Sequence, residues 1–254
     1  MTISQTVKIP ILTYHSIDDS GSVISTSPPV FQAQMKFLKE SNFNVISLNT
    51  LVKSSDENKP LPEKSIILTF DDGFQNFYTE AYPILNKYDF TATVFLITDH
   101  CGKLNDWTGN LATLEYRKLM NWRDIKELSS QGIVFGAHSK THPDLTKISI
   151  IDAKREMTES KLVIENQLGI KVTDFAYPYG NFNFEIKQIA AQYFKTACST
   201  NLGKVASKDD FFSLKRLDSY YLSNQQIFRS LLSTKFDWYI SLRQTMREIK
   251  KRVL

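Results

Sequence analysis

The chain has 254 residues, of which 42% are hydrophobic, and its 31 basic and 27 acidic side chains give a net charge of +4. A chain of this length and composition can bury one substantial core, and parallel α/β barrels commonly reach this size as one domain. The charges are too balanced to indicate a nucleic-acid-binding protein. Their slight basic excess is still compatible with an anionic substrate or with binding to a membrane surface. We therefore predict a single domain over residues 1–254 that ends in a basic helix over residues 235–254.

The cysteines and the first residues bear on the cellular compartment. Cys101 and Cys198 lie far apart and form no C-x-x-C pair, which favours reduced, structural thiols. The first ten residues lack a basic region followed by a long apolar run. No stretch approaches the roughly 18 apolar residues that a membrane span needs. These features predict a cytoplasmic protein, with a peripheral position at the membrane left open.

Short apolar runs rich in β-branched residues alternate along the chain with stretches of helical character. The apolar runs predict strands at residues 9–15, 43–48, 65–71, 91–98, 133–138, 174–177, 196–199 and 214–220. Helices are predicted at residues 29–40, 76–87, 121–131, 149–168, 183–193 and 224–232. This alternation predicts an α/β fold of parallel strands and helical crossovers, with residues 54–62 as a surface loop.

Side chains suited to catalysis occur at the predicted ends of these strands. His15 ends the first strand, Asp71 and Asp72 lie at the end of the third, and His138 and His142 lie at and just beyond the end of the fifth. In a parallel barrel the carboxyl ends of the strands meet at one face, where catalytic residues are usually found. We expect these five side chains to build one site.

A catalytic zinc usually holds three protein ligands and keeps one position open for water. Asp72, His138 and His142 supply that number, and the three-residue gap between the histidines lets both rings face one point if the segment turns helically. Taken alone, a pair at this spacing is more often a loop residue and a buried structural imidazole. The neighbouring acids favour a metal, because charge at the rim of a buried strand needs a partner. Zinc is the default ion, with cobalt, nickel and iron as alternatives.

Two further residues fit a hydrolytic reaction at such a metal. Adjacent carboxylates of an extended chain point in different directions, so Asp72 can bind the metal while Asp71 faces the metal-bound water as general base. The metal lowers the pKa of that water towards about 7, which makes attack on an acyl carbonyl accessible. In the turn over residues 176–181, the Tyr179 amide is a candidate oxyanion donor, although the turn could be only a rigid connection.

Three motifs in this order resemble those of the polysaccharide deacetylases, the NodB-homology family also called carbohydrate esterase family 4. They are Thr69-Phe-Asp-Asp-Gly73, His138-Ser-x-x-His142-Pro-x-Leu145 and Tyr177-Pro-Tyr-Gly180. The resemblance covers most of the chain, from about Ile9 to Tyr220. It implies a distorted (β/α) barrel with about seven strands and the metal-dependent removal of an acetyl group from an N-acetylated or, less often, O-acetylated sugar. It also implies the roles assigned above to the acids, the histidine pair and the Tyr179 amide.

The chain departs from the family pattern at two places. The family commonly has an arginine that orients the base where this chain has Ala176, and Arg216 is a candidate replacement unless it is an exposed arginine beside a strand. Many members also carry a general-acid histidine near the C-terminus, but no histidine follows His142 here. The segment Ile11-Leu-Thr-Tyr-His15 resembles the permuted branch of exopolysaccharide N-deacetylases, which makes His15 the proton donor to the leaving amine.

The remaining features leave alternatives open. Residues 236–254 are basic and amphipathic, so they either pack on the barrel as a terminal helix or lie on a membrane surface near a lipid-linked sugar. Trp107 either stacks on a sugar or anchors its loop. The expected substrate is an acetylated sugar, oligosaccharide or lipid-linked glycan. A related C–N or ester hydrolase with a non-sugar substrate, or a carbohydrate-binding barrel without turnover, are the rival interpretations.

Overall fold

A computed structural model describes residues 8–107, 109, 115–206 and 208–253. Within these residues, seven parallel strands close a barrel, in which β2 pairs with β12 on one side and with β6 on the other. The strands, in spatial order, are β2 (Ile11–Tyr14), β12 (Leu214–Asp218), β10 (Thr196–Leu202), β9 (Asp174–Ala176), β8 (Val134–Ala137), β7 (Thr93–Leu96) and β6 (Ser65–Phe70). This arrangement confirms the predicted distorted (β/α) barrel.

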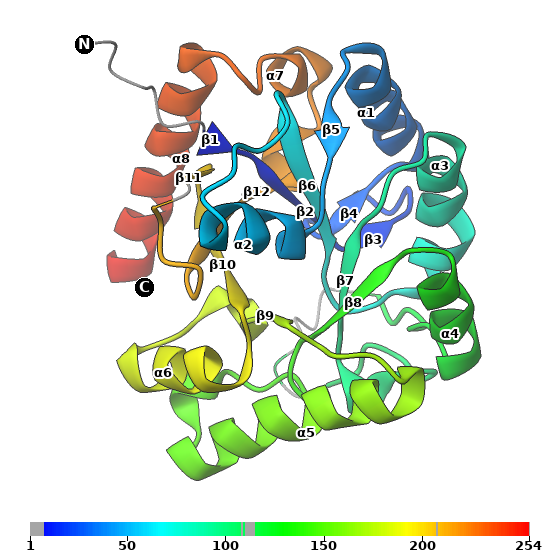
Figure 1. Cartoon of the computed structure of the whole chain (residues 1–254), viewed down its shortest axis with the longest axis vertical. Coiled ribbons are helices and arrows are strands. Elements are labelled where there is room, and N and C mark those ends of the chain that lie inside the picture. The colour runs from blue at the N-terminus through cyan, green and yellow to red at the C-terminus, as the bar shows by residue number, and fades with distance from the viewer. Residues whose placement is uncertain (1–7, 108, 110–114, 207, 254) are drawn as a thin grey trace.

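Helices surround the strands (Figure 1). They are α1 (Pro28–Glu40), α2 (Leu48–Asp56), α3 (Tyr82–Lys87), α4 (Trp122–Ser130), α5 (Ile150–Leu168), α6 (Phe184–Tyr193), α7 (Gln225–Arg229) and α8 (Thr234–Val253). All six residues of β6 are buried, as expected of a parallel strand that is covered on both faces. Helix α5 begins where the Ser149 hydroxyl accepts a hydrogen bond from the Asp152 amide, and it ends at Gly169 in the left-handed conformation.

Short elements complete the fold around the barrel. The strand β5 (Asn44–Val45) extends the sheet beyond β6, and β1 (Lys8–Ile9) pairs antiparallel with β11 (Val205–Ala206). Near the end of β2, β3 (Ser16–Ile17) pairs with β4 (Ser25–Thr26). Four 3₁₀ turns lie within the described residues, namely η2 (Thr98–His100), η3 (Leu145–Lys147), η4 (Pro178–Gly180) and η5 (Ser219–Leu222).

The structure differs from the sequence predictions in three elements. The strand expected over residues 43–48 is only two residues long, and helix α2 begins where the Ser47 hydroxyl caps the Thr50 amide. The helix expected over residues 76–87 opens with a π-helical turn at Phe77–Ala81. The last strand ends at Asp218, whose carboxylate accepts a hydrogen bond from the Tyr220 amide and so begins η5. In each case a local side-chain cap or turn overrides the apolar pattern.

Helix α8 packs on the barrel through one face. Phe236 and Ile240 are buried in the main core, whereas Trp238 and Leu242 are exposed. The Arg247 guanidinium donates a hydrogen bond to the carbonyl of Thr200, just beyond the middle of β10. Among the residues with described positions, no helix is long and apolar enough to cross a bilayer.

Candidate active site

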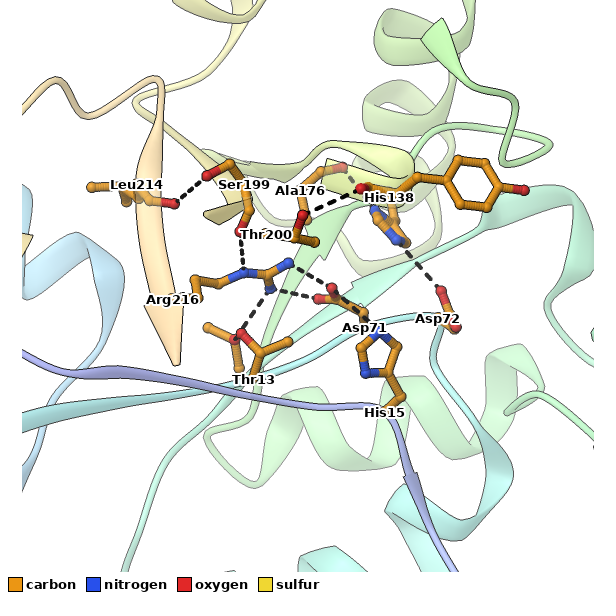
Figure 2. Close-up of polar contacts among 12 residues, drawn as sticks. Thr13, His15, Asp71, Asp72, His138, Ala176, Ser199, Thr200, Leu214 and Arg216 are labelled. Atoms are coloured by element: carbon orange, nitrogen blue, oxygen red, sulfur yellow. Dashed lines mark hydrogen bonds and ion pairs between the residues drawn. The ribbon is translucent and has the colours of Figure 1, made fainter. Parts of the chain in front are cut away.

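The carboxyl ends of β2, β6 and β8 bring the predicted site residues together. His15 follows β2, Asp71 and Asp72 follow β6, and His138 and His142 follow β8. All five line one cavity of about 340 Å³. Figure 2 shows four of these side chains directed toward one another, with the Asp71 carboxylate at the centre. Segments that are far apart in the sequence therefore share one site because parallel strands end at the same face of a barrel.

Asp72, His138 and His142 form a buried cluster in which each residue offers one ligand atom. The Asp72 Oδ1 atom lies 3.4 Å from His138 Nε2 and 3.7 Å from His142 Nε2, and the two Nε2 atoms are 3.2 Å apart. Two atoms bound to one tetrahedral zinc at about 2.0–2.1 Å lie about 3.3 Å from each other. The cluster therefore has the dimensions of a three-ligand site for a divalent metal.

The pKa values of the two rings are shifted in opposite directions. His138 Nδ1 lies 2.7 Å from the carbonyl oxygen of Ala176, to which it donates, so Nε2 faces the cluster. Burial lowers the pKa of His138, but the hydrogen bond to Asp72 and the charges of Asp71 and Asp72 outweigh burial and raise it. Burial, followed by the charge of His138, lowers the pKa of His142 to about 3, which keeps this ring neutral. Aromatic contacts hold the His142 ring, whose centroid lies 4.8 Å from that of Trp107 and 4.6 Å from that of Tyr179. A neutral imidazole is the form that binds a metal.

The loop that carries the histidine pair is not helical. Ser139 and His142 both have a φ of 62°, and the His142 amide donates a hydrogen bond to the Ser139 hydroxyl at 3.0 Å. The expectation that a helical turn brings the two histidine rings together was therefore wrong. Two residues in the left-handed conformation, Ser139 and His142, bring them together instead. Asp72 also has a positive φ of 70°, which separates the direction of its carboxylate from that of Asp71. Non-glycine residues in this region are strained, and such strain is common at functional sites.

Arg216 holds the second carboxylate. Its Nη1 and Nη2 atoms lie 2.7 and 2.6 Å from the two oxygens of Asp71, and its Nε donates to the carbonyl of Ser199 at 2.9 Å. Only 2% of Arg216 is exposed, so the alternative of an exposed arginine beside a strand is wrong. Burial alone raises the pKa of Asp71, but the charge and hydrogen bonds of Arg216 outweigh burial and hold it well below its usual range. Asp71 is therefore ionised at neutral pH.

His15 lies on the other side of Asp71. Its Nε2 atom is 3.9 Å from Asp71 Oδ2, and 21% of its side chain is exposed. The ring lines the same cavity as the Asp-His-His cluster but is not one of the cluster's ligand atoms. His15 therefore faces the cavity without belonging to the cluster.

The turn η4 forms another wall of the cavity. Tyr179 has a φ of 58°, and its carbonyl accepts a hydrogen bond from the Thr200 hydroxyl at 3.3 Å. A side chain at Gly180 would place its Cβ 2.2 Å from Thr200 Oγ1, so this close approach requires glycine. The Tyr179 ring, 38% exposed, packs against His142 and also lines the cavity, a contact that the sequence did not indicate.

Trp107 and three residues that the sequence analysis did not single out are also part of the lining. Trp107 is 7% exposed and packs with Ile97 and Leu119, so it anchors its loop, while its ring also contacts His142. Ile24, Asn105 and Thr200 line the cavity as well. No sequence pattern indicated these three, because neither their type nor their spacing marks them as site residues.

A parallel barrel with an Asp-His-His cluster beside a second, arginine-held carboxylate defines a metal-dependent hydrolase. The family described as polysaccharide deacetylase matches residues 58–197, which is more than half of the chain, and the chain therefore belongs to the polysaccharide deacetylase family. The match confirms the resemblance seen in the three motifs. As a member of this family the protein is a hydrolase of the polysaccharide deacetylase type.

Relatives of known sequence support this assignment. The Bacillus subtilis (strain 168) protein YxkH, which carries the family's name, is 28% identical over 211 residues, covering 83% of this chain and 71% of the relative. The poly-beta-1,6-N-acetyl-D-glucosamine N-deacetylases of Escherichia coli (strain K12) and Staphylococcus epidermidis are each 28% identical, over 48% and 63% of this chain. This chain spans only 19% and 55% of the lengths of these two enzymes.

Solved structures share the fold. The Streptococcus pyogenes deacetylase PplD, solved in complex with acetate, superposes with a TM-score of 0.73 at 32% identity, covering 84% of this chain and 93% of PplD. IcaB from Ammonifex degensii superposes with a TM-score of 0.72 over 85% of this chain and 95% of its own, and at 23% identity it supports the fold alone.

Proposed function

We propose that this protein removes the acetyl group from an N-acetylated sugar of a glycan. In this proposal Asp72, His138 and His142 hold a divalent metal, Asp71 is the general base and His15 is the general acid. The observation that carries it is the pairing, in one cavity, of a buried Asp-His-His cluster with a carboxylate that Arg216 holds. The names of the Escherichia coli and Staphylococcus epidermidis relatives support a substrate built from N-acetylglucosamine.

The reaction adds water across the amide bond and yields acetate and a free amine. A bound divalent cation, which we propose is zinc, would polarise the acetyl carbonyl and lower the pKa of water. Asp71 accepts a proton from the attacking water, because it is ionised and each of its oxygens keeps a lone pair beyond the bond to Arg216. The bidentate contact fixes the direction of this base.

His15 supplies the proton that the leaving nitrogen needs. An amine leaves an amide carbon readily only when it is protonated, and imidazole is a suitable donor near neutral pH. The position of His15, 3.9 Å from Asp71 and outside the metal cluster, supports this assignment.

The Tyr179 amide is the proposed partner of the negative charge that develops on the acetyl oxygen. It lies in a turn that lines the cavity, and the hydrogen bond from Thr200 to the Tyr179 carbonyl holds the turn in place. An N–H fixed in advance stabilises the transition state more than the planar amide. A hydrolase for a non-sugar substrate would need the same parts, so the choice of substrate rests on the family.

A mass-spectrometric screen tests the proposed function. Acetylated sugars, sugar nucleotides, lipid-linked glycans and N-acetylglucosamine oligomers are each incubated with the purified protein, and loss of one acetyl group is scored. Asp71→Asn is the blank, since it keeps the size of the side chain but removes the base. Equal acetyl loss with the wild type and with the blank would overturn the proposal. So would deacetylation of a non-sugar amide when no sugar substrate loses its acetyl group.

We also propose that α8 contacts a membrane surface. The exposed side chains Trp238, Leu242, Met246 and Ile249 leave one side of the helix apolar, and its six basic residues outnumber its two acidic ones. The test is flotation with anionic liposomes. It compares the membrane binding of the wild type with that of a double variant, Trp238→Ser and Ile249→Ser. Equal flotation of both would remove this proposal and, with it, the peripheral location.

A further inference from the structure

A second cavity, of about 500 Å³, lies beside the candidate active site. We call it the side cavity, and define it by Ser25, Ser219, Tyr220, Asn224 and Arg243. These residues come from β4, from η5, from the start of α7 and from α8. No step of the proposed reaction uses them. A cavity of this volume is large enough to hold one or more sugar units.

One short segment separates the two cavities. Ile24 lines the active-site cavity, and the next residue, Ser25, lines the side cavity. The Thr26 hydroxyl donates a hydrogen bond to the Ser219 hydroxyl at 2.9 Å and so ties β4 to the turn that follows β12. A glycan that places one sugar beside Asp71 can therefore extend over this wall into the side cavity.

The lining combines an arginine, aromatic rings and hydroxyl groups. The guanidinium of Arg243 lies 5.2 Å from the ring centroid of Tyr239 and 5.7 Å from that of Tyr221. The Tyr220 ring meets Tyr221 edge to face at 5.3 Å and is 53% exposed. Stacking on rings leaves the in-plane N–H groups of an arginine free to bind a ligand.

The charge of the side cavity is uncompensated. Neither an aspartate nor a glutamate belongs to its described lining. Across the part of the chain with described side chains, no carboxylate forms an ion pair with Arg243 and no acceptor takes a hydrogen bond from it. Sites for neutral sugars commonly need acceptors for the sugar hydroxyls, whereas a planar guanidinium matches the two oxygens of a carboxylate or phosphate. The lining therefore favours an anionic group.

We propose that the side cavity binds an oxyanion, a carboxylate or a phosphate, that the glycan carries next to the sugar that loses its acetyl group, with Arg243 as the anion ligand. The substrate class rests on the proposed function. Hydroxyl groups of Ser25, Ser219 and Tyr220 bind the sugar ring that bears the anion. The enzyme consequently prefers an anionic acetylated glycan to a neutral one of equal length.

Steady-state kinetics with three tetrasaccharides test this inference. One is built from N-acetylglucosamine alone, one alternates N-acetylglucosamine with a uronic acid, and one carries a terminal phosphate. Arg243→Gln should raise KM about ten- to a hundredfold for an anionic tetrasaccharide, with kcat unchanged, because a hydrogen bond to a charged group is lost. The uronic acid and phosphate arms show which oxyanion is preferred. The neutral tetrasaccharide should not respond.

Two variants serve as controls. Arg229→Gln removes an arginine that lies 5.8 Å from the Phe37 ring and outside the side cavity, and it should leave all three KM values unchanged. Asn224→Asp keeps the oxygen that caps α7 but adds a negative charge to the lining, so it should weaken the binding of anionic substrates. This second variant tests the inference even if Arg243→Gln fails to fold.

Binding to the Asp71→Asn protein separates the two proposals. Calorimetric titration with the anionic tetrasaccharides needs no turnover, so binding that depends on Arg243 would support the side cavity even if no sugar were deacetylated. Equal KM values for Arg243→Gln and wild type on every tetrasaccharide, with normal deacetylation, would overturn the side cavity and leave the proposed function intact. If Arg243→Gln raised KM equally for neutral and anionic substrates, the proposed role of the side cavity would also be overturned.

Discussion

Arg216 on β12 binds both carboxylate oxygens of Asp71 at the end of β6, at 2.7 and 2.6 Å, although 145 residues separate the two in the sequence. The third motif of this chain has Ala176 where the resemblance led us to expect an arginine. An arginine from a different strand therefore contacts the proposed base. This contact supplies the support for Asp71 that Ala176 cannot give.

The first prediction concerns this pair. Arg216→Met should lower kcat and shift the acid limb of the pH profile upward. Without the guanidinium, burial raises the pKa of Asp71, so the carboxylate is protonated at a higher pH and is lost as a base there. Breaking a buried pair also costs about 3–5 kcal/mol of folding stability. The pH dependence of kcat/KM and the urea unfolding midpoint measure the two effects.

Arg216→Lys is the matched control for Arg216→Met. It retains the positive charge but loses the bidentate contact, so its acid limb should shift less than that of the methionine variant. If both variants keep the wild-type pH profile, Arg216 has no influence on the base.

The second prediction concerns His15. His15→Ala should reduce kcat by about 10²–10⁴-fold, because the leaving amine loses its proton donor. Metal content should not change, since His15 contributes no atom to the cluster. Turnover numbers and metal analysis of the same preparation measure both. Wild-type turnover in the variant would remove His15 from the mechanism.

The third prediction concerns the metal. The purified protein should bind one divalent ion per chain, lose activity to a chelator and regain it when zinc is added back. His142→Ala should lower the metal affinity, because it removes one of three ligands. His100→Ala is a matched control, since His100 contacts Trp107 but lies outside the cluster. Loss of metal from both variants alike would argue against the assigned site.

The fourth prediction concerns the turn η4. Gly180→Ala should destabilise the fold by about 1–3 kcal/mol and lower kcat, because the new Cβ overlaps Thr200 and displaces the Tyr179 amide. Gly132→Ala is the matched control, with a φ of 87° but no atom within 4 Å of its added Cβ. It should lose stability without losing kcat. Equal kcat in the two variants would exclude a role for the turn in turnover.

Several parts of the fold could be predicted from local sequence. The strands that became β6 and β8 stood out as apolar runs. The helix predicted over residues 121–131 is α4, which Asn121 caps with two hydrogen bonds. Helix α2 was missed, because its three buried residues, Leu48, Leu51 and Val52, lie among polar neighbours. Short amphipathic helices carry too few apolar positions to define a period.

The sequence by itself determined which residues could form the metal cluster, since Asp72, His138 and His142 each follow an apolar strand and such strands end at one face of a barrel. Only the tertiary structure decided which arginine meets Asp71. That choice depends on β12 pairing with β2, which in turn pairs with β6, so that Arg216 lies within reach of the base. The neighbours of a strand are set by closure of the whole barrel, a long-range property that no local pattern records.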